Sequence, residues 1–224
     1  MGDIEKVKKM LSLIPPDLDG ARKELSEAGF SKEELAEIAI DAAYSCFDEY
    51  HDALNLEKTG ITVDAMNSGY LIETLQILLD HGLDPNTVVD DENVMWLLQY
   101  ADAPNIGPAA LRLLLENGGD PNHVFPADAV ETLFEYVTYK VSYDEYTHEF
   151  FHTVQFWLVL LAYGGHWRNG SIPITMLNGY TVEIFKDFES FDYTIEPLPQ
   201  EPGKYGCWIM HIFRVDNDEE VARF

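Results

Sequence analysis

One nine-residue string that occurs twice constrains the fold more than any other feature of the chain. "LLDHGLDPN" fills residues 78–86, and "LLENGGDPN" fills residues 114–122, 36 residues later. In each copy a leucine-rich stretch runs into glycine, which just past a helix end can adopt the left-handed conformation that closes the last carbonyls. The Asp-Pro-Asn that follows stops the helix and forms a turn. Two such strings, each preceded by a helix-sized segment, predict a repeated supersecondary unit.

Two weaker copies follow the same logic. "KELSEAGFS" at 23–31 and "LLAYGG" at 160–165 also end helical stretches at a glycine, although His-Trp-Arg replaces Asp-Pro-Asn after the second. Between these markers each segment has apolar residues at helical spacing and is long enough for two helices. Ser31 and Glu34 form a capping box that starts one of them. We therefore expect antiparallel helix pairs stacked side by side, a solenoid. The predicted markers are Gly29, Gly82, Gly118 and Gly164.

The marker resembles a known family. The pattern Leu-Leu-x-x-Gly-x-Asp-Pro-Asn is similar to the end of the outer helix and the turn of an ankyrin repeat, and the resemblance covers roughly residues 20–170. It implies a mainly α solenoid of ankyrin-like helical pairs with projecting β-hairpin fingers. The units here are longer and less regular than those of the family, and "NVMWLL" stands where its inner helix opens with Thr-Pro-Leu-His.

The pattern changes after about residue 170. The stretches "YTVEIF", "FDYTIEPL", "YGCWIMHIFRV" and "EEVARF" are short, rich in β-branched and aromatic residues, and bounded by turn signals. We expect a helical array over residues 1–170 and, over residues 171–224, a small antiparallel β meander that caps its end. A separate small domain is the alternative, but about fifty residues bury little core alone.

The net charge narrows the choice of partner. The chain carries 40 acidic and 14 basic side chains, a formal net charge of −26. Such a surface repels nucleic acid and anionic lipid and attracts basic proteins, so we expect a basic protein partner, with no nucleic acid and no membrane. A surface that only keeps the chain soluble explains the charge equally well. Two cysteines make no disulfide framework, and the longest apolar run, "FWLVLLAY" at 156–163, is too short to span a bilayer. We expect a cytoplasmic protein.

One string suggests metal chemistry. "HEFFH" at 148–152 would place His148 and His152 one helical turn apart as zinc ligands, with Glu149 as a base for the metal-bound water. No Gly-x-x-His follows, and the same helix has a core stripe that leads to Gly164. A zinc hydrolase is therefore the distant alternative. The preferred prediction is a protein that is not an enzyme and has no catalytic residues, no metal and no cofactor.

The resemblance also implies where a partner binds. In ankyrin repeats the finger tips and the inner helices form the binding face, and aromatic side chains among carboxylates suit a basic protein. Each candidate residue also has a simpler interpretation, either as a core residue or as part of a solvated loop. The candidate finger residues are Asp90, Asp91, Glu92, Phe125 and Asp128, and the candidate inner-helix residues are Trp96, Tyr100, Glu131, Glu135 and Tyr139.

Size, charge and repeats together suggest a function class. Small acidic proteins with divergent ankyrin-like repeats resemble the immunity proteins of bacterial toxin systems, which neutralise a cognate toxin, often a basic nuclease. The resemblance implies a non-catalytic protein-binding module of this kind. A general ankyrin-like scaffold or regulator is the alternative, and the neighbouring genes would distinguish the two.

Overall fold

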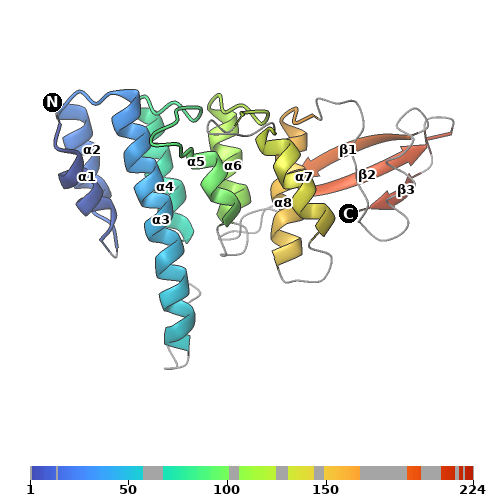
Figure 1. Cartoon of the computed structure of the whole chain (residues 1–224), viewed down its shortest axis with the longest axis horizontal. Helices are drawn as coiled ribbons and strands as arrows, with labels where there is room; N and C mark the ends of the chain where they lie inside the picture. The colour runs from blue at the N-terminus through green and yellow to red at the C-terminus, as the bar shows by residue number, and fades with distance from the viewer. Residues whose placement is uncertain are drawn as a thin grey trace. The chain divides into compact units, whose positions relative to one another are not determined.

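The computed structural model shows a mainly helical chain, as the sequence predicts. It describes residues 2–13, 15–57, 68–100, 106–124, 131–143, 149–166, 191–197, 208–214, 217–218 and 220–223. These residues form eight α-helices, one short 3₁₀ helix and three strands (Figure 1). The elements are α1 (Ile4–Leu11), α2 (Leu18–Glu27), α3 (Lys32–Glu57), α4 (Ser68–Asp80), α5 (Val94–Leu97), η1 (Leu98–Tyr100), α6 (Ile106–Glu116), α7 (Leu133–Tyr143), α8 (Glu149–Ala162), β1 (Phe191–Pro197), β2 (Trp208–Arg214) and β3 (Glu220–Arg223).

The chain divides into two compact units. Unit 1 is Met1–Asp120 with Phe125–Asp128, and unit 2 is Pro121–Val124 with Ala129–Phe224. Helices α7 and α8 therefore belong with the strands, whereas the sequence suggests a division near residue 170. The array over residues 1–170 and the capping role of residues 171–224 stay predictions.

In unit 1 the α-helices that contact each other most extensively lie one or two α-helices apart in the chain. Helix α1 contacts α2 and α3, α3 contacts α4 and α5, and α4 contacts α6 (Figure 1). The predicted capping box begins α3: the Ser31 N–H donates to Glu34 Oε2 at 2.7 Å, and the Glu34 N–H donates to Ser31 Oγ at 3.2 Å. The apolar stripes meet in a core whose fully buried members include Leu35, Ile38, Leu71, Leu75, Leu78, Met95, Leu98 and Leu111.

Three glycine turns end helices α4, α6 and α8 in the same way. Gly82, Gly118 and Gly164 have φ of +100°, +94° and +90°. At the first turn the Gly82 N–H donates to Leu79 O and the Leu83 N–H donates to Leu78 O, both at 3.0 Å. Equivalent bonds close the other two turns, and together they make the Schellman motif that glycine favours.

The earliest predicted marker behaves differently. Helix α2 ends at Glu27, and its C-cap residue Ala28 is extended, with φ −115° and ψ 128°. Gly29 is not among the described glycines with positive φ. The prediction of a left-handed glycine cap at this position is wrong, because the chain leaves α2 through extended backbone instead of a Schellman turn.

Unit 2 contains a helix pair and a small sheet. The Phe134 and Trp157 rings stack with centroids 6.3 Å apart, and the Trp157 indole donates to Thr138 Oγ1 at 3.0 Å, which joins α7 to α8. Strands β1, β2 and β3 form an antiparallel sheet in that order, with Thr194 opposite His211, and β2 contacts α8. The predicted strand "YTVEIF" lies outside the described residues.

Candidate functional site

The asparagine of each Asp-Pro-Asn marker binds the next glycine turn. Asn86 Nδ2 donates to the Gly118 carbonyl at 2.9 Å, and its Oδ1 accepts the Asp120 N–H at 2.7 Å. In unit 2 the Asn122 amide makes the equivalent bonds to the Gly164 carbonyl at 3.1 Å and from the His166 N–H at 2.9 Å. We call these two amides the asparagine clamps. They explain in physical terms why the string recurs: each copy provides both a turn and a clamp.

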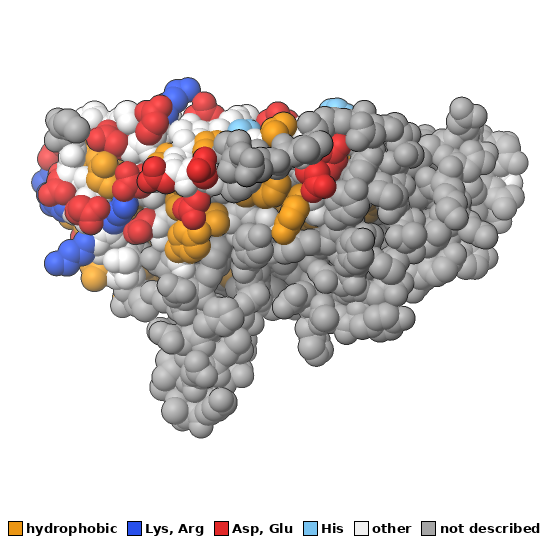
Figure 2. Space-filling view, viewed as in Figure 1, with side chains coloured by type: hydrophobic (Ala, Val, Ile, Leu, Met, Phe, Trp, Pro, Cys, Tyr) orange, Lys and Arg blue, Asp and Glu red, His pale blue; other side chains and the backbone are white. Residues whose placement is uncertain are grey.

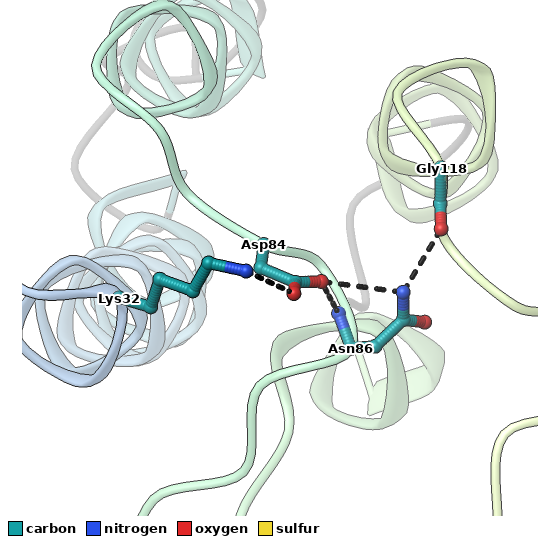
Figure 3. A network of polar contacts seen from close by, with 4 residues as sticks. All are labelled: Lys32, Asp84, Asn86 and Gly118. Atoms are coloured by element: carbon teal, nitrogen blue, oxygen red, sulfur yellow. Dashed lines mark hydrogen bonds and ion pairs between the residues drawn. The ribbon is translucent and has the colours of Figure 1, made fainter.

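The aspartate of the first marker, Asp84, also forms hydrogen bonds and an ion pair with other residues of unit 1 (Figure 3). Asp84 Oδ2 accepts from Lys32 Nζ at 3.0 Å, while Oδ1 accepts from the Asn86 N–H at 3.1 Å and from Asn86 Nδ2 at 3.3 Å. The hydrogen bonds from Lys32 and from the Asn86 backbone hold the pKa of the Asp84 carboxyl below its ordinary value. This carboxylate joins α3 to the marker loop.

The loop after this marker carries an exposed acidic turn. The Val89 N–H donates to Glu92 O at 3.0 Å, and the Glu92 N–H donates to Val89 O at 2.8 Å. Between them Asp90 and Asp91 have φ of +48° and +63°, the pattern of a type I′ turn, and both are exposed. We call residues 89–92 the acidic finger. It is a hairpin of the shortest kind, with two carboxylates at its tip.

Two side chains fix the acidic finger to the rest of unit 1. The buried amide of Asn93 donates to Pro85 O at 2.9 Å and to Thr87 O at 3.0 Å, while its Oδ1 accepts the Met95 N–H and so caps α5. The Tyr44 hydroxyl of α3 donates to the Glu92 carboxylate. The finger therefore stands on a fixed base.

Sequence reasoning did not single out Tyr44. The residue is 42% exposed, and its hydroxyl lies beside the acidic finger. It follows Glu37 and Asp41 at helical spacing on the charged face of α3, away from the apolar stripe. A tyrosine on an otherwise charged helix face was the available signal.

Two of the candidate inner-helix residues are buried. Trp96 is 8% exposed and Glu135 is 2% exposed. The Thr132 N–H donates to Glu135 Oε2 at 2.9 Å, and the Glu135 N–H donates to Thr132 Oγ1 at 3.1 Å, a capping box that satisfies the first turn of α7. The expectation that these two side chains face a partner is therefore corrected, because one is in the core and the other caps a helix.

The remaining candidates have mixed positions. Glu131 is half-buried beside the start of α7. Tyr100 lies on η1 and Tyr139 on α7, and their side chains are outside the described set, as are Phe125 and Asp128 altogether. The structure thus brings Asp90, Asp91 and Glu92 together and does not test the predicted second finger.

The zinc hypothesis falls mostly outside the described residues. His148 is not described, and Glu149 and His152 are placed on α8 by their backbone alone. Over the parts of the chain that the structure does describe, no three His, Cys, Asp or Glu side chains lie close enough to share a metal ion. The hydrolase stays an alternative prediction.

Charge is distributed unevenly along the chain. Residues 1–32 hold six of the 14 basic and six of the 40 acidic side chains, so the later residues carry the whole net charge of −26. On the face that Figure 2 shows, the visible lysine and arginine side chains lie toward the end that holds α1 and α2, and acidic side chains lie across the described part of the face. None of the described helices has both the length and the apolar character needed to cross a membrane.

Comparison with known proteins gives no family. No protein-family model matches the sequence, no curated protein matches it, and no solved structure matches the fold. Function must therefore be argued from the residues of this chain.

Proposed function

We propose that this chain is a non-catalytic, acidic protein-binding module of ankyrin-like helical pairs that binds and neutralises a basic protein. In its sharpest form it is an immunity protein that covers the active face of a basic toxin such as a nuclease. The observation that carries the proposal is the acidic finger, which presents Asp90 and Asp91 at an exposed tip above a fixed base.

The conformation of the finger tip supports a binding role. A type I′ turn needs positive φ at both central positions and favours glycine, asparagine and aspartate, but the second position, which Asp91 occupies, is most often glycine. The aspartates place negative charge at the tip at some conformational cost, and such cost is characteristic of functional sites. Neither carboxylate forms an ion pair in the described structure, so both remain available to a cationic side chain.

Preorganisation adds to the argument. The finger is already held by the Val89–Glu92 bonds, the buried Asn93 amide and the Tyr44 hydroxyl. A loop that is ordered before binding loses less conformational entropy when a partner docks. The net charge of −26 acts over a longer range and would steer a basic protein toward this surface. The finger would then provide local contacts, and the rest of the chain would speed the encounter.

A charge-neutral variant tests the proposal. Asp90→Asn with Asp91→Asn removes two charges and keeps side chains that tolerate positive φ, so the turn should survive. The control is Glu33→Gln with Glu73→Gln, which makes the same change in net charge at two exposed helical positions. The basic protein recovered with the full chain from its native cell, or the product of the adjacent gene, serves as the partner.

The expected result is slower association and a flatter salt dependence for the finger variant, with about tenfold weaker binding, while the control stays near the parent chain. Equal kinetics for the two variants would move the interface away from the finger. If neither pull-down nor co-expression with the neighbouring gene recovers a basic partner, the hypothesis of a toxin-neutralising protein is wrong and a general scaffold is favoured.

A further inference from the structure

The N-terminal helix pair contributes little to the apolar core of unit 1. We call residues 2–31, which contain α1 and α2, the N-terminal hairpin. Among its described residues only Val7, Ala21 and Leu25 are buried apolar side chains. Helix α4 alone, over 13 residues, buries more: Leu71, Leu75, Ile77 and Leu78. Regions with few buried apolar contacts open locally at a lower free energy than the core does.

Among the described residues, two side-chain bonds attach helices α1 and α2 to other helices or turns. Lys8 Nζ of α1 is 2.7 Å from Glu37 Oε1 of α3, and Ser26 Oγ of α2 is 3.0 Å from His81 Nε2. The first is the stronger, because the Lys8 side chain is only 16% exposed. Other ion pairs of the hairpin, Lys6 with Glu24 and Lys23 with Glu27, stay inside it and do not attach it to α3.

Helix α3 presents an acidic face toward this lysine. Burial opposes the charge of Lys8, but the hydrogen bond to Glu37 and the charges of Asp41, Glu37 and Glu5 outweigh it, so the pKa of Lys8 is raised. The lysine therefore stays positively charged and pairs with the start of the acidic part of the chain. Salt screens this attraction less than that of a fully exposed pair, but the Glu37 side chain is 43% exposed, so the attraction still weakens as ionic strength rises.

The hairpin lies against a helix that is apolar on more than one side. Five of the six residues from 35 to 40 in α3 are buried, and at 100° per residue they span more than half of the helix circumference. Helix α3 contacts α1 and also contacts α4 and α5. Release of the hairpin would leave α4 and α5 in place and expose the part of this apolar arc that α1 covers.

We propose that the N-terminal hairpin is a releasable cap, latched over the apolar side of α3 by Lys8 and Glu37, and that it opens as one piece while α4–α6 stay folded. The latch is electrostatic and the apolar contact beneath it is small. Ionic strength therefore controls the opening. In the open state α3 presents a strip of apolar side chains edged by carboxylates, which is hidden when the cap is closed.

Hydrogen exchange of the full chain at low salt and at about 1 M salt, where the Debye length is about 3 Å, tests this. We expect the amides of α1 and α2 to exchange together and before those of α4, and to exchange faster at high salt. Salt should slow exchange in α4, because it screens the self-repulsion of a chain with net charge −26. Opposite responses in the two regions distinguish the latch from a general salt effect.

The latch variant is Lys8→Gln, and its control is Lys23→Gln, which removes an ion pair within α2. We expect the first to raise the opening equilibrium of the hairpin about threefold to fivefold at low salt and to remove most of its salt response. The second should change neither. Exchange of the hairpin only together with α4 would overturn the proposal, because it would mean a single cooperative unit. Early exchange that ignores both salt and Lys8 would also overturn it, because it would mean fraying without a latch.

Discussion

Two helical segments that each follow an Asp-Pro-Asn marker, α5–η1 in unit 1 and α7 in unit 2, have matching positions and unequal bonding. Counted from the N-caps Asn93 and Thr132, Met95 corresponds to Phe134 and Gln99 corresponds to Thr138. The Thr138 hydroxyl donates to Phe134 O at 2.7 Å and accepts from Trp157, whereas both amide atoms of the buried Gln99 have no hydrogen-bond partner among the residues that the structure describes. The same architectural position is satisfied in one unit and unsatisfied in the other. The shared backbone pattern therefore does not determine the polar interactions made at matching positions.

The largest expected effect comes from the glycines that follow the left-handed turns. A Cβ on Gly165 would lie 2.5 Å from the Phe134 ring and 2.9 Å from Leu160 O, whereas on Gly119 it would lie 2.8 Å from the flexible Met95 sulfur and 3.0 Å from Leu114 O. Overpacking costs about 1–3 kcal/mol. We expect Gly165→Ala to lose about 3 kcal/mol and Gly119→Ala about 1 kcal/mol in chemical denaturation. Equal losses would show that the ring yields as easily as the thioether.

Removal of the asparagine clamps should have the next largest effect. Asn86→Ala and Asn122→Ala each delete two bonds to the following turn, so each should lower the free energy of unfolding by about 2 kcal/mol. Asn117→Ala is the control, because its amide donates to Leu113 O of the preceding helix α6 and not to a following turn, and a loss of about 0.5 kcal/mol is expected. If a clamp variant is as stable as this control, the glycine turns do not need the asparagine bonds to keep their conformation.

Substitutions at Thr138 and at Gln99 should change the free energy of unfolding in opposite directions. Thr138→Val removes the acceptor of the Trp157 indole, and we expect a loss of about 1–2 kcal/mol. Gln99→Leu replaces a buried amide for which the described part of the chain offers no hydrogen-bond partner, and we expect a gain of about 1 kcal/mol, because the desolvation cost of the amide disappears. Thermal and urea unfolding would measure both. Loss of stability in Gln99→Leu would indicate that the amide is solvated in solution.

The smallest expected effect depends on pH. Because the pKa of Asp84 is lowered in the folded state, its contribution is fully present above the unfolded value of about 3.9 and is lost as pH falls through the folded pKa. Lys32→Gln should therefore destabilise the chain at neutral pH by less than about 1 kcal/mol, since both side chains are partly exposed. The difference between variant and parent should vanish toward about pH 2, as followed by urea unfolding across pH. A constant difference would assign the effect to packing of the lysine stem.

Local signals made part of the structure predictable from the sequence. The left-handed turns at Gly82, Gly118 and Gly164 and the capping box of Ser31 and Glu34 follow from residues a few positions apart. The same rule was available at Thr132, whose Thr-x-x-Glu pattern marks the start of α7 and places Glu135 inside a cap. Counting from the pattern would have removed Glu135 from the binding candidates.

Contacts between distant residues were not predictable from one chain. The Asn86 amide binds a turn 32 residues later, and the Tyr44 hydroxyl reaches Glu92 across 48 residues. No pattern of neighbouring residues indicates which distant residue a side chain will contact, because tertiary packing decides which side chains meet. The positions of Asp90 and Asp91 a few residues after the Asp-Pro-Asn marker were enough to expect them at an exposed finger tip. The contacts that hold this finger could not be expected, because they come from the buried Asn93 amide and from Tyr44 of α3.

The asparagine clamps have a consequence for how the spacing of the chain can vary. Across each junction the clamp bonds to the backbone of the following glycine turn, so these bonds do not depend on how many residues lie between one turn and the next. The intervals from Gly82 to Gly118 and from Gly118 to Gly164 are 36 and 46 residues, yet the bonds at both junctions match. Residues can therefore be gained or lost at the opposite ends of the helices, and the turns still keep their register.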